Sequence, residues 1–493
     1  MMNMGHMGVC VVVLPLLTAL ACFLFQDKYT KLCVTLGGVG SILLAFLLGF
    51  QIFQHGEYAY ALGGWPKPLG IHLNIDGFSV VMLCVTALLG CFLCFYAFGY
   101  FPKGKPLTIS FWPLCFFCVA GLNVLFLSFD LFNIYVALEI ISFSAISLVA
   151  LSASTTALAA ATQYFFLTII GSLVYLLGVV FIYGAYSTLD FGLLSGLIQP
   201  GVVTGLALTL MTIGLIIKSA LFPMHFWLPS AHANAPAPVS AILSGLVIMG
   251  SFYMLVRLWF ETFAGIFIPL AGQLIGVLAS IAILGGAVMA LRQTRIKMML
   301  AYSTISQIGY MFLIFPLYSD SPLVQGFAWN GGIYLALSHA FAKGSAFMVA
   351  GIILYVLGRD NLEDCVGLAE RYPLTFFAFG LAGVSLIGLP PSGGFIGKWM
   401  LLKAAMLSGQ WGYALLIAFG SILSAAYIFR IFEVFLHKPL SAEKSLAAPM
   451  GMQLSALVIA SIATMLGLAA NIPLTILRIG SMFSLDSMKG LIF

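Results

Sequence analysis

Long apolar runs follow one another along nearly the whole chain, and polar residues gather in the short segments between them. A helix that crosses a bilayer needs about 20 predominantly apolar residues. By that measure there are about fourteen candidate spans, of which the seventh and twelfth are interrupted: 7–25, 32–53, 77–99, 109–128, 130–152, 162–185, 202–222, 237–260, 268–291, 297–316, 330–356, 373–408, 411–436 and 451–473. The pattern predicts an all-α polytopic membrane protein with a single membrane domain over residues 1–493.

The composition strengthens this prediction. Hydrophobic residues make up 62% of the 493 residues and charged residues only 7%, which leaves no room for a sizeable solvated domain. The formal net charge of +5 does not indicate nucleic-acid binding, because the basic residues are dispersed among short loops. No Lys or Arg precedes the first apolar run, so we expect an uncleaved first span there and not a signal peptide.

The distribution of Lys and Arg between the spans predicts the orientation. Four basic residues lie in the even-numbered loops and the tails: Lys67, Arg257, Arg478 and Lys489. Twelve lie in the odd-numbered loops: Lys28, Lys31, Lys103, Lys105, Arg292, Arg295, Lys297, Arg359, Arg371, Arg430, Lys438 and Lys444. Because cytoplasmic loops carry the excess of positive charge, we expect a cell-membrane protein with both termini outside the cytoplasm.

Few ionisable residues remain inside the spans. Glu139 is the one acid well inside an apolar run, and the lysines there are Lys218, Lys343, Lys398 and Lys403. Ionisable groups at membrane depth are costly to bury and are functional candidates for that reason. A Glu–Lys pair could exchange protons as its members approach and separate; the alternative is a static ion pair that holds two helices together.

The seventh span is broken next to its charge. Lys218 lies five residues before Pro223, and three further prolines follow, with His225 and His232 between them. Proline removes a helix donor and clashes with the preceding turn, and irregular backbone at membrane depth survives only inside protein or beside a wet cavity. The twelfth span repeats the arrangement, with Lys398 after the break at residues 388–397. Five spans separate the breaks, and an odd offset predicts inverted copies.

A third group stands on the eleventh span. His339 and Lys343 have the i, i+4 spacing that places two side chains on one helix face. An imidazole accepts and releases protons near neutral pH, so this pair is a candidate relay. The alternative for His339 is a hydrogen-bonded core residue.

Several other motifs do not carry a site. The CxxC pairs Cys91/Cys94 and Cys115/Cys118 lie in apolar runs without a basic neighbour, so we interpret them as packing residues. The run before Lys398 lacks the first Gly and the final Ser/Thr of a phosphate-binding loop. His225 and His232 have no third ligand nearby, so we expect no metal site. We also expect no cofactor; with no redox centre in this chain, enzymatic activity is left open and electron transfer would belong to partners.

Five segments in combination resemble the antiporter-like subunits of the complex I superfamily: DLFNIYVALE (130–139), IKSALFPMHFWLPSAHANAPAPVSA (217–241), KMMLAYSTISQIGYMF (297–312), LSHAFAKGSAFMVAG (337–351) and GLPPSGGFIGKW (388–399). That family includes proton-conducting subunits of respiratory NADH dehydrogenase, of membrane-bound hydrogenases and of Mrp-type antiporters. The resemblance implies three helices over 1–108, two inverted five-helix repeats over 109–260 and 268–436, and a last helix and tail over 451–493. It also implies a proton relay along the membrane midplane through Glu139, Lys218, His339, Lys343 and Lys398.

One position departs from the family pattern. The family usually carries a lysine or histidine on the eighth helix, where this chain has Met249, with Ser244 at the position of a histidine found in some members. Methionine cannot pass a proton. Either waters held by Ser244, Ser251 and Tyr253 bridge the gap, or the relay is cut at this point. His225, His232, Ser244 and Met249 are therefore candidate relay or gating positions.

The leading hypothesis is a proton-translocating subunit of a multisubunit membrane complex, with other membrane subunits and lipid as partners. Two segments, LGGWPKPLGIHLNIDG and LSFDLFNIYVALE, most resemble the group formed by the D subunits of Mrp antiporters and the hydrogenase-associated subunits, so a cation/proton antiporter that exchanges H⁺ for Na⁺ or K⁺ is favoured. The alternatives are a proton-pumping subunit of a hydrogenase or NADH dehydrogenase, a non-conducting scaffold, and a stand-alone transporter of a small solute.

Overall fold

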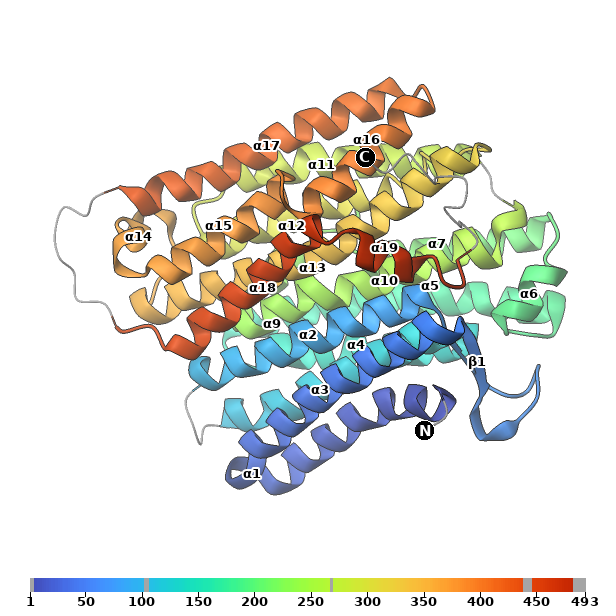
Figure 1. The fold of residues 1–493 in the computed structure, drawn as a ribbon, viewed down its shortest axis with the longest axis horizontal. Coiled ribbons are helices and arrows are strands. Elements are labelled where there is room, and N and C mark those ends of the chain that lie inside the picture. Colours follow the sequence, from blue (N-terminus) through green and yellow to red (C-terminus); the bar gives the residue numbers. More distant parts are fainter. Residues whose placement is uncertain (1–3, 102–105, 267–268, 438–445, 482–493) are drawn as a thin grey trace.

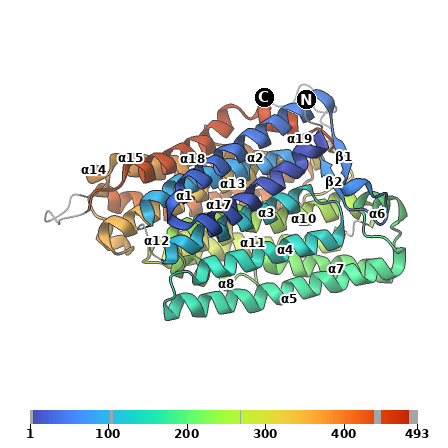
Figure 2. The same cartoon turned by 90° about the horizontal axis from the view of Figure 1, so that it is seen from below.

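The computed structural model describes residues 4–101, 106–266, 269–437 and 446–481. Long helices lie side by side in one bundle, with a small β-hairpin and α6 at one end and α14 at the other (Figures 1 and 2). Among the described residues, eleven helices are long and apolar enough to cross a membrane. The prediction of an all-α polytopic membrane protein is confirmed at this level. The other three predicted spans correspond to shorter helices, α7, α12 and the pair α15 and α16.

The N-terminal part matches the predicted spans but adds a hairpin that the apolar pattern did not reveal. Its helices are α1 (Met4–His55), α2 (Gly77–Tyr100) and α3 (Pro106–Leu127). Helix α1 contains the first two predicted spans, which join at Gln26 in a left-handed conformation (φ 39°). Strands β1 (Tyr58–Ala61) and β2 (His72–Ile75) pair antiparallel, with Tyr58 opposite Ile75 and a 3₁₀ turn, η1 (Leu62–Gly64), after β1.

The next four helices are α4 (Leu131–Ala150), α5 (Thr155–Tyr186), α6 (Phe191–Leu197) and α7 (Val202–Lys218). Asp130 caps α4, because its Oδ1 accepts hydrogen bonds from the backbone N–H groups of Phe132 and Asn133 at 3.0 and 2.8 Å. Helices α5 and α7 approach closely enough for their backbones to meet. A Cβ added to Gly171 would lie 3.0 Å from the carbonyl oxygen of Gly214.

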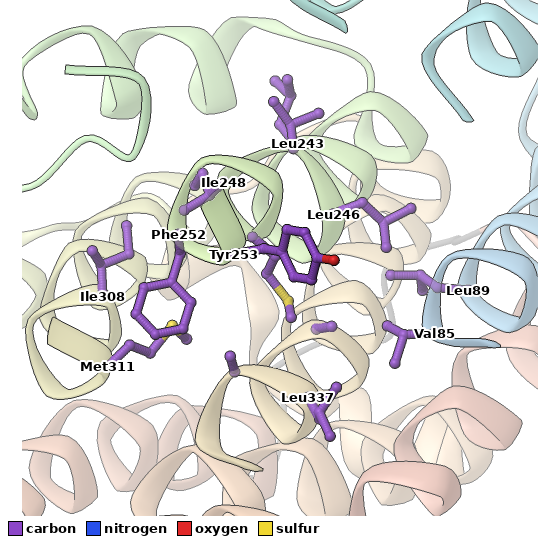
Figure 3. Close-up of a cluster of buried hydrophobic side chains, with 14 of the residues drawn as sticks. Val85, Leu89, Leu243, Leu246, Ile248, Phe252, Tyr253, Ile308, Met311 and Leu337 are labelled. Carbon is purple, nitrogen blue, oxygen red and sulfur yellow. The ribbon is translucent and has the colours of Figure 1, made fainter. Parts of the chain in front are cut away.

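The predicted break of the seventh span is present. Helix α7 ends at Lys218, and the chain continues through turns into the short helices α8 (Trp227–Asn234) and α9 (Ala237–Ile242). A continuous helical run follows that includes π-helical turns: η2 (Leu243–Val247), α10 (Ile248–Arg257) and η3 (Leu258–Thr262), before the 3₁₀ turn η4 (Ala264–Ile266). Apolar side chains of α2, α12 and α13 surround this run, which is buried on all sides (Figure 3).

The second half contains α11 (Pro269–Arg292), α12 (Ile296–Phe312), α13 (Pro322–Leu357), η5 (Leu362–Cys365), α14 (Leu368–Arg371), α15 (Pro373–Ile387), α16 (Gly393–Leu407), α17 (Trp411–Leu436), α18 (Met450–Leu468) and α19 (Asn471–Leu477). The twelfth predicted span is broken as expected. Gly388 ends α15 with a φ of 87°, and Ser392 caps α16 by accepting a hydrogen bond from the Phe395 N–H at 3.2 Å.

Two details of the sequence-based assignment were wrong. The last predicted span, 451–473, ends at Leu468, and a separate helix begins at Asn471. Lys297, assigned above to a cytoplasmic loop, is the second residue of α12 and only 1% exposed. Of the residues used for the orientation, Lys103, Lys105, Lys438, Lys444 and Lys489 lie outside the described part of the chain.

Candidate functional site

Glu139 and Lys218 meet where the seventh span breaks. Lys218 Nζ lies 3.6 Å from Glu139 Oε1, and the two side chains are 6% and 18% exposed. Lys218 also donates a hydrogen bond to Ser142 Oγ at 2.7 Å, and Ser172 Oγ of α5 donates one to Glu139 Oε1. The structure thus brings together the carboxylate and the ammonium that the sequence placed 79 positions apart, and it adds two serine hydroxyls that the sequence did not indicate.

The backbone contact between α5 and α7 positions this pair. Gly171 is next to Ser172, and Gly214 lies one turn before Lys218. Because neither glycine has a side chain, the two helices approach closely at the level of the charges. Trp227 then fixes the segment after the break: its indole N–H donates to the carbonyl oxygen of Ile217 at 3.2 Å, and its ring stacks on Tyr164 of α5 with centroids 4.2 Å apart.

Polar side chains precede and follow, along the chain, the methionine at the departure from the family pattern. Met249 is 1% exposed. Two residues after it, Ser251 Oγ accepts a hydrogen bond from Ser219 Oγ at 3.0 Å, which links the residue after Lys218 to α10. Five residues before it, Ser244 Oγ lies 3.0 Å from Thr304 Oγ1 of α12. Tyr253 instead donates its hydroxyl to the Phe126 carbonyl oxygen at 2.7 Å.

The eleventh-span pair lies at the centre of the molecule on α13. Lys343 Nζ donates hydrogen bonds to the carbonyl oxygen of Leu300, at 2.8 Å, and to Ser303 Oγ. Thr304 donates to that same carbonyl oxygen at 3.0 Å. Lys343 and Thr304 therefore share an acceptor, and Thr304 in turn contacts Ser244. His339 is also buried, and neither of its ring nitrogens completes a hydrogen bond with a described residue.

The structure adds two buried groups to this centre. Lys297 Nζ donates to the carbonyl oxygen of Ala235, the residue after α8. His232 is fully buried and stacks on Phe347 of α13, four residues after Lys343, with centroids 4.7 Å apart. By contrast, His225 is only partly buried and stacks on Phe222 within the break, so the two histidines that flank Pro229 lie in different surroundings.

Lys398 spans the second break. From α16 it donates hydrogen bonds to the carbonyl oxygens of Leu386 and Ile387, at 3.2 and 2.9 Å. These are the last residues of α15, whose terminal carbonyls lack partners in their own helix and carry the negative end of the helix dipole. The ammonium also lies 4.2 Å from the centroid of the Tyr310 ring. Lys403 points elsewhere, over Trp399 and Phe327.

The lysines of the first and second halves of the chain have different partners for their positive charge. Among the described residues, Lys218 has an acid within 4 Å, whereas Lys343 and Lys398 are held by carbonyl and hydroxyl oxygens and by no carboxylate. Neutral partners hold an ammonium less tightly than a carboxylate does. Glu139 is therefore the carboxylate that compensates the charge of Lys218, and the other two lysines depend on neutral oxygens.

A further charged cluster lies at the end of the bundle that carries the hairpin. Arg257 Nη1 lies 2.6 Å from Asp76 Oδ2 and 2.7 Å from Glu261 Oε2, and Tyr253 accepts a hydrogen bond from Arg257 Nε at 3.0 Å. The sequence pattern placed Asp76 and Glu261 at span ends, yet Asp76 is 1% exposed. No group of three or more His, Cys, Asp or Glu side chains that could hold a metal ion occurs within the described ranges.

Buried Glu, Lys and His side chains beside two broken helices, inside a polytopic bundle, are typical of membrane transport proteins. Residues 128–424 match the family described as NADH:quinone oxidoreductase/Mrp antiporter, transmembrane. The chain is 34% identical over 438 residues to NADH-quinone oxidoreductase subunit N of Desulforudis audaxviator, covering 87% of this chain and 86% of the relative. The chain therefore belongs to the complex I/Mrp antiporter membrane subunit family, as the sequence motifs indicated.

Other similar proteins include both antiporter subunits and subunits of redox complexes. The chain is 28% identical to the D subunit of the Na⁺/H⁺ antiporter of Alkalihalophilus pseudofirmus, covering 87% of this chain and 86% of that one. Its fold matches a chain of the Mrp complex from Dietzia sp., with a TM-score of 0.88, 23% identity and full coverage of both chains. It matches a chain of an archaeal membrane-bound sulfane sulfur reductase equally well, with 26% identity and 98% coverage of both. All three are parts of multisubunit membrane complexes or are named as subunits.

Proposed function

We propose that this chain translocates protons as an antiporter-like subunit of a multisubunit membrane complex. The observation that carries the proposal is the Glu139–Lys218 contact at the break of the seventh span, at 3.6 Å and largely buried. A charged pair at membrane depth costs several kcal/mol to bury, in the range of about 2.5–3.5 kcal/mol for one central charge on insertion scales. Such a cost is more readily explained by transport than by helix packing, which apolar residues achieve without it.

In the proposed mechanism, protons pass between Glu139 and Lys218, then His339 and Lys343, and then Lys398. Each site changes protonation as its neighbour gains or loses charge, because like charges repel and opposite charges attract across short buried distances. The serine and threonine hydroxyls beside Met249 suit water-mediated transfer between the first and second sites.

The proposal includes the finer topology. We infer fourteen membrane crossings, made by the eleven long helices together with α7, α12 and the α15–α16 pair. Helices of residues 109–260 and 268–436 form two inverted repeats, each with a lysine at its break. Both termini lie outside the cytoplasm. The orientation rests on eleven odd-loop cations against three, since Lys297 and Arg257 are both buried in helices and leave the original counts of twelve and four.

We favour an Mrp-type cation/proton antiporter, with Na⁺ or K⁺ as the exchanged ion, because the segments around Trp65 and Asp130 resemble the Mrp D subunit and two relatives carry that name. A proton-pumping complex of the NADH dehydrogenase or hydrogenase type is the second candidate, and the 34% identical relative supports it. Solubilising the native complex and identifying its other subunits distinguishes the two: redox subunits favour the second candidate and their absence the first.

Reconstituted vesicles test the proposed transport. Glu139→Ala and Lys218→Ala are expected to abolish cation/proton exchange or pumping while the complex still assembles. Lys403→Ala is the matched control, since this lysine lies at membrane depth but outside the proposed row. Full activity in both variants would refute the relay. Intact ion flux with weakened assembly in Lys218→Ala would instead favour a structural scaffold.

A further inference from the structure

His232 is a buried imidazole to which the relay through Glu139, Lys218, His339, Lys343 and Lys398 assigns no role. It is 0% exposed, and among the described residues neither ring nitrogen has a hydrogen-bond partner. A buried polar group without a partner is costly, and such groups in native proteins are places where ordered water binds. An imidazole whose two nitrogens are both free of protein hydrogen bonds can take up a proton on one nitrogen and release one from the other.

The elements around His232 hold it in a fixed place. Its helix, α8, is tied to α7 by the bond from Trp227 to the Ile217 carbonyl, 3.2 Å long, and to α12 by the bond from Lys297 to the Ala235 carbonyl. Ser240 Oγ donates to the carbonyl oxygen of His232 itself at 3.0 Å. The imidazole lies on Phe347 with 18° between the ring planes, so its orientation is set by stacking and not by a hydrogen bond from either ring nitrogen to a described residue.

Its neighbours are members of the proposed row. Phe347 follows Lys343 by four residues, and Lys343 follows His339 by four, so the three lie along one side of α13. The stacking on Phe347 places the imidazole of His232 against this side of α13, one helical turn beyond Lys343. His232 therefore reaches the central site from the broken seventh span, the same segment that carries Lys218.

We propose that His232 replaces the missing helix-eight station and passes protons between the Lys218 site and Lys343. The inference rests on the proposed function. The Lys218 ammonium gives a proton, through water, to the unprotonated ring nitrogen, and the imidazolium then releases the proton of its other nitrogen, through water, to a neutral Lys343 amine. Lys218 loses one proton and Lys343 gains one, and rotation of the neutral ring restores the first tautomer. The segment after the break of the seventh span thus supplies, as the His232 imidazole, the proton-carrying group that α10 lacks at Met249.

The test uses the purified complex in vesicles, with proton uptake driven by an imposed membrane potential. His232→Gln retains a polar side chain of similar size but cannot relay a proton, so we expect the flux to fall about tenfold or more with normal assembly. His437→Gln makes the same change at an exposed position and should leave the flux unchanged. A lysine at the family position should then compensate, so His232→Gln with Met249→Lys should regain much of the flux.

Met249→His provides a second rescue variant, since the buried lysine could impair folding. Both changes at 249 are first made alone, and the one that assembles normally is combined with His232→Gln. Wild-type flux in an assembled His232→Gln complex overturns the inference, as does an assembled double variant without recovery. Lys218→Ala separates this result from the larger proposal: an inactive Lys218→Ala with an active His232→Gln refutes the His232 role alone, whereas an active Lys218→Ala refutes the relay.

Discussion

Neutralising the Glu139–Lys218 pair, one member at a time and then together, separates its contribution to stability from its role in transport. Glu139→Gln keeps the size of the side chain and an oxygen that can accept the Ser172 hydroxyl. Lys218→Met keeps an unbranched apolar stem but removes the charge. The double variant removes both charges, and Glu363→Gln, in the exposed turn before α14, is the control for the chemical change.

The magnitude follows from the separation. At an effective dielectric constant of about 20, two unit charges 3.6 Å apart attract by about 4–5 kcal/mol. Breaking a buried pair by removing one member costs about 3–5 kcal/mol, because the remaining charge is left uncompensated. The double variant leaves no unpaired charge, so its loss should be much smaller than the sum of the two single losses. The expected coupling free energy is about 2–4 kcal/mol, allowing for solvent at the 18% exposed Glu139 side chain.

Two assays are made on the same preparations. Thermal or denaturant unfolding of the purified complex gives the stability of each variant, and dye-reported proton uptake in vesicles gives transport. All three variants should lose transport by at least about tenfold, the factor that corresponds to about 1.4 kcal/mol, including the double variant whose stability recovers. Transport that recovers together with stability would show that the pair serves packing, and additive losses of stability would show that the charges do not interact.

Substitutions at two other sites test the second break and the start of α4. Lys398→Met leaves the Leu386 and Ile387 carbonyls without their ammonium donor, so it should stop transport and lower the free energy of unfolding by about 1–3 kcal/mol. The control Lys403→Met should change neither transport nor stability. Equal losses in the two lysine variants would contradict this prediction. Asp130→Ala should cost about 1 kcal/mol as a lost helix cap and Asp130→Asn close to nothing. Burial raises the pKa of Asp130 above its ordinary 3.8, so the folded state favours the protonated carboxyl. The stability that the protonated carboxyl contributes is therefore lost as pH rises from 3.8 through the raised pKa. Unfolding scans between pH 4 and 7 should therefore show that Asp130→Asn becomes more stable relative to wild type as pH rises. A difference in the free energy of unfolding that stays constant over this range would refute the raised pKa of Asp130.

Much of the fold could be predicted because the bilayer forces apolar residues into long helices, and both breaks could be predicted from proline and glycine beside a lysine. The contact between Glu139 and Lys218 was also predictable, since each is a rare charge at membrane depth and has few possible partners. The role of Ser142 and Ser172 was not, because serine is common in membrane helices and its sequence position carries no sign of a neighbour on another helix.

The errors have physical causes as well. Lys297 follows Arg292 and Arg295, so position along the chain placed it in a loop, whereas α12 begins at Ile296 and its first turn lies beneath α8. Asp76 stands at the end of a span, where the sequence gives no sign of a buried partner, yet the side chain of Arg257, 181 residues away, pairs with it. Such pairings depend on which helices are neighbours, and the periodicity of a single helix contains no information on that. The β-hairpin was missed because its strands have only four residues each.

The glycine contact between α5 and α7 changes how a collection of inactive mutants of this protein should be interpreted. A methyl group on Gly214 would come within 2.8 Å of the Tyr175 backbone nitrogen, so Gly214→Ala must push α7 outward one turn before its terminal lysine. A screen for loss of transport would then recover an uncharged substitution with normal expression beside the charged positions. Ranking positions by such a screen alone would place a spacer residue among the proton carriers, and the small size of glycine would be mistaken for chemistry.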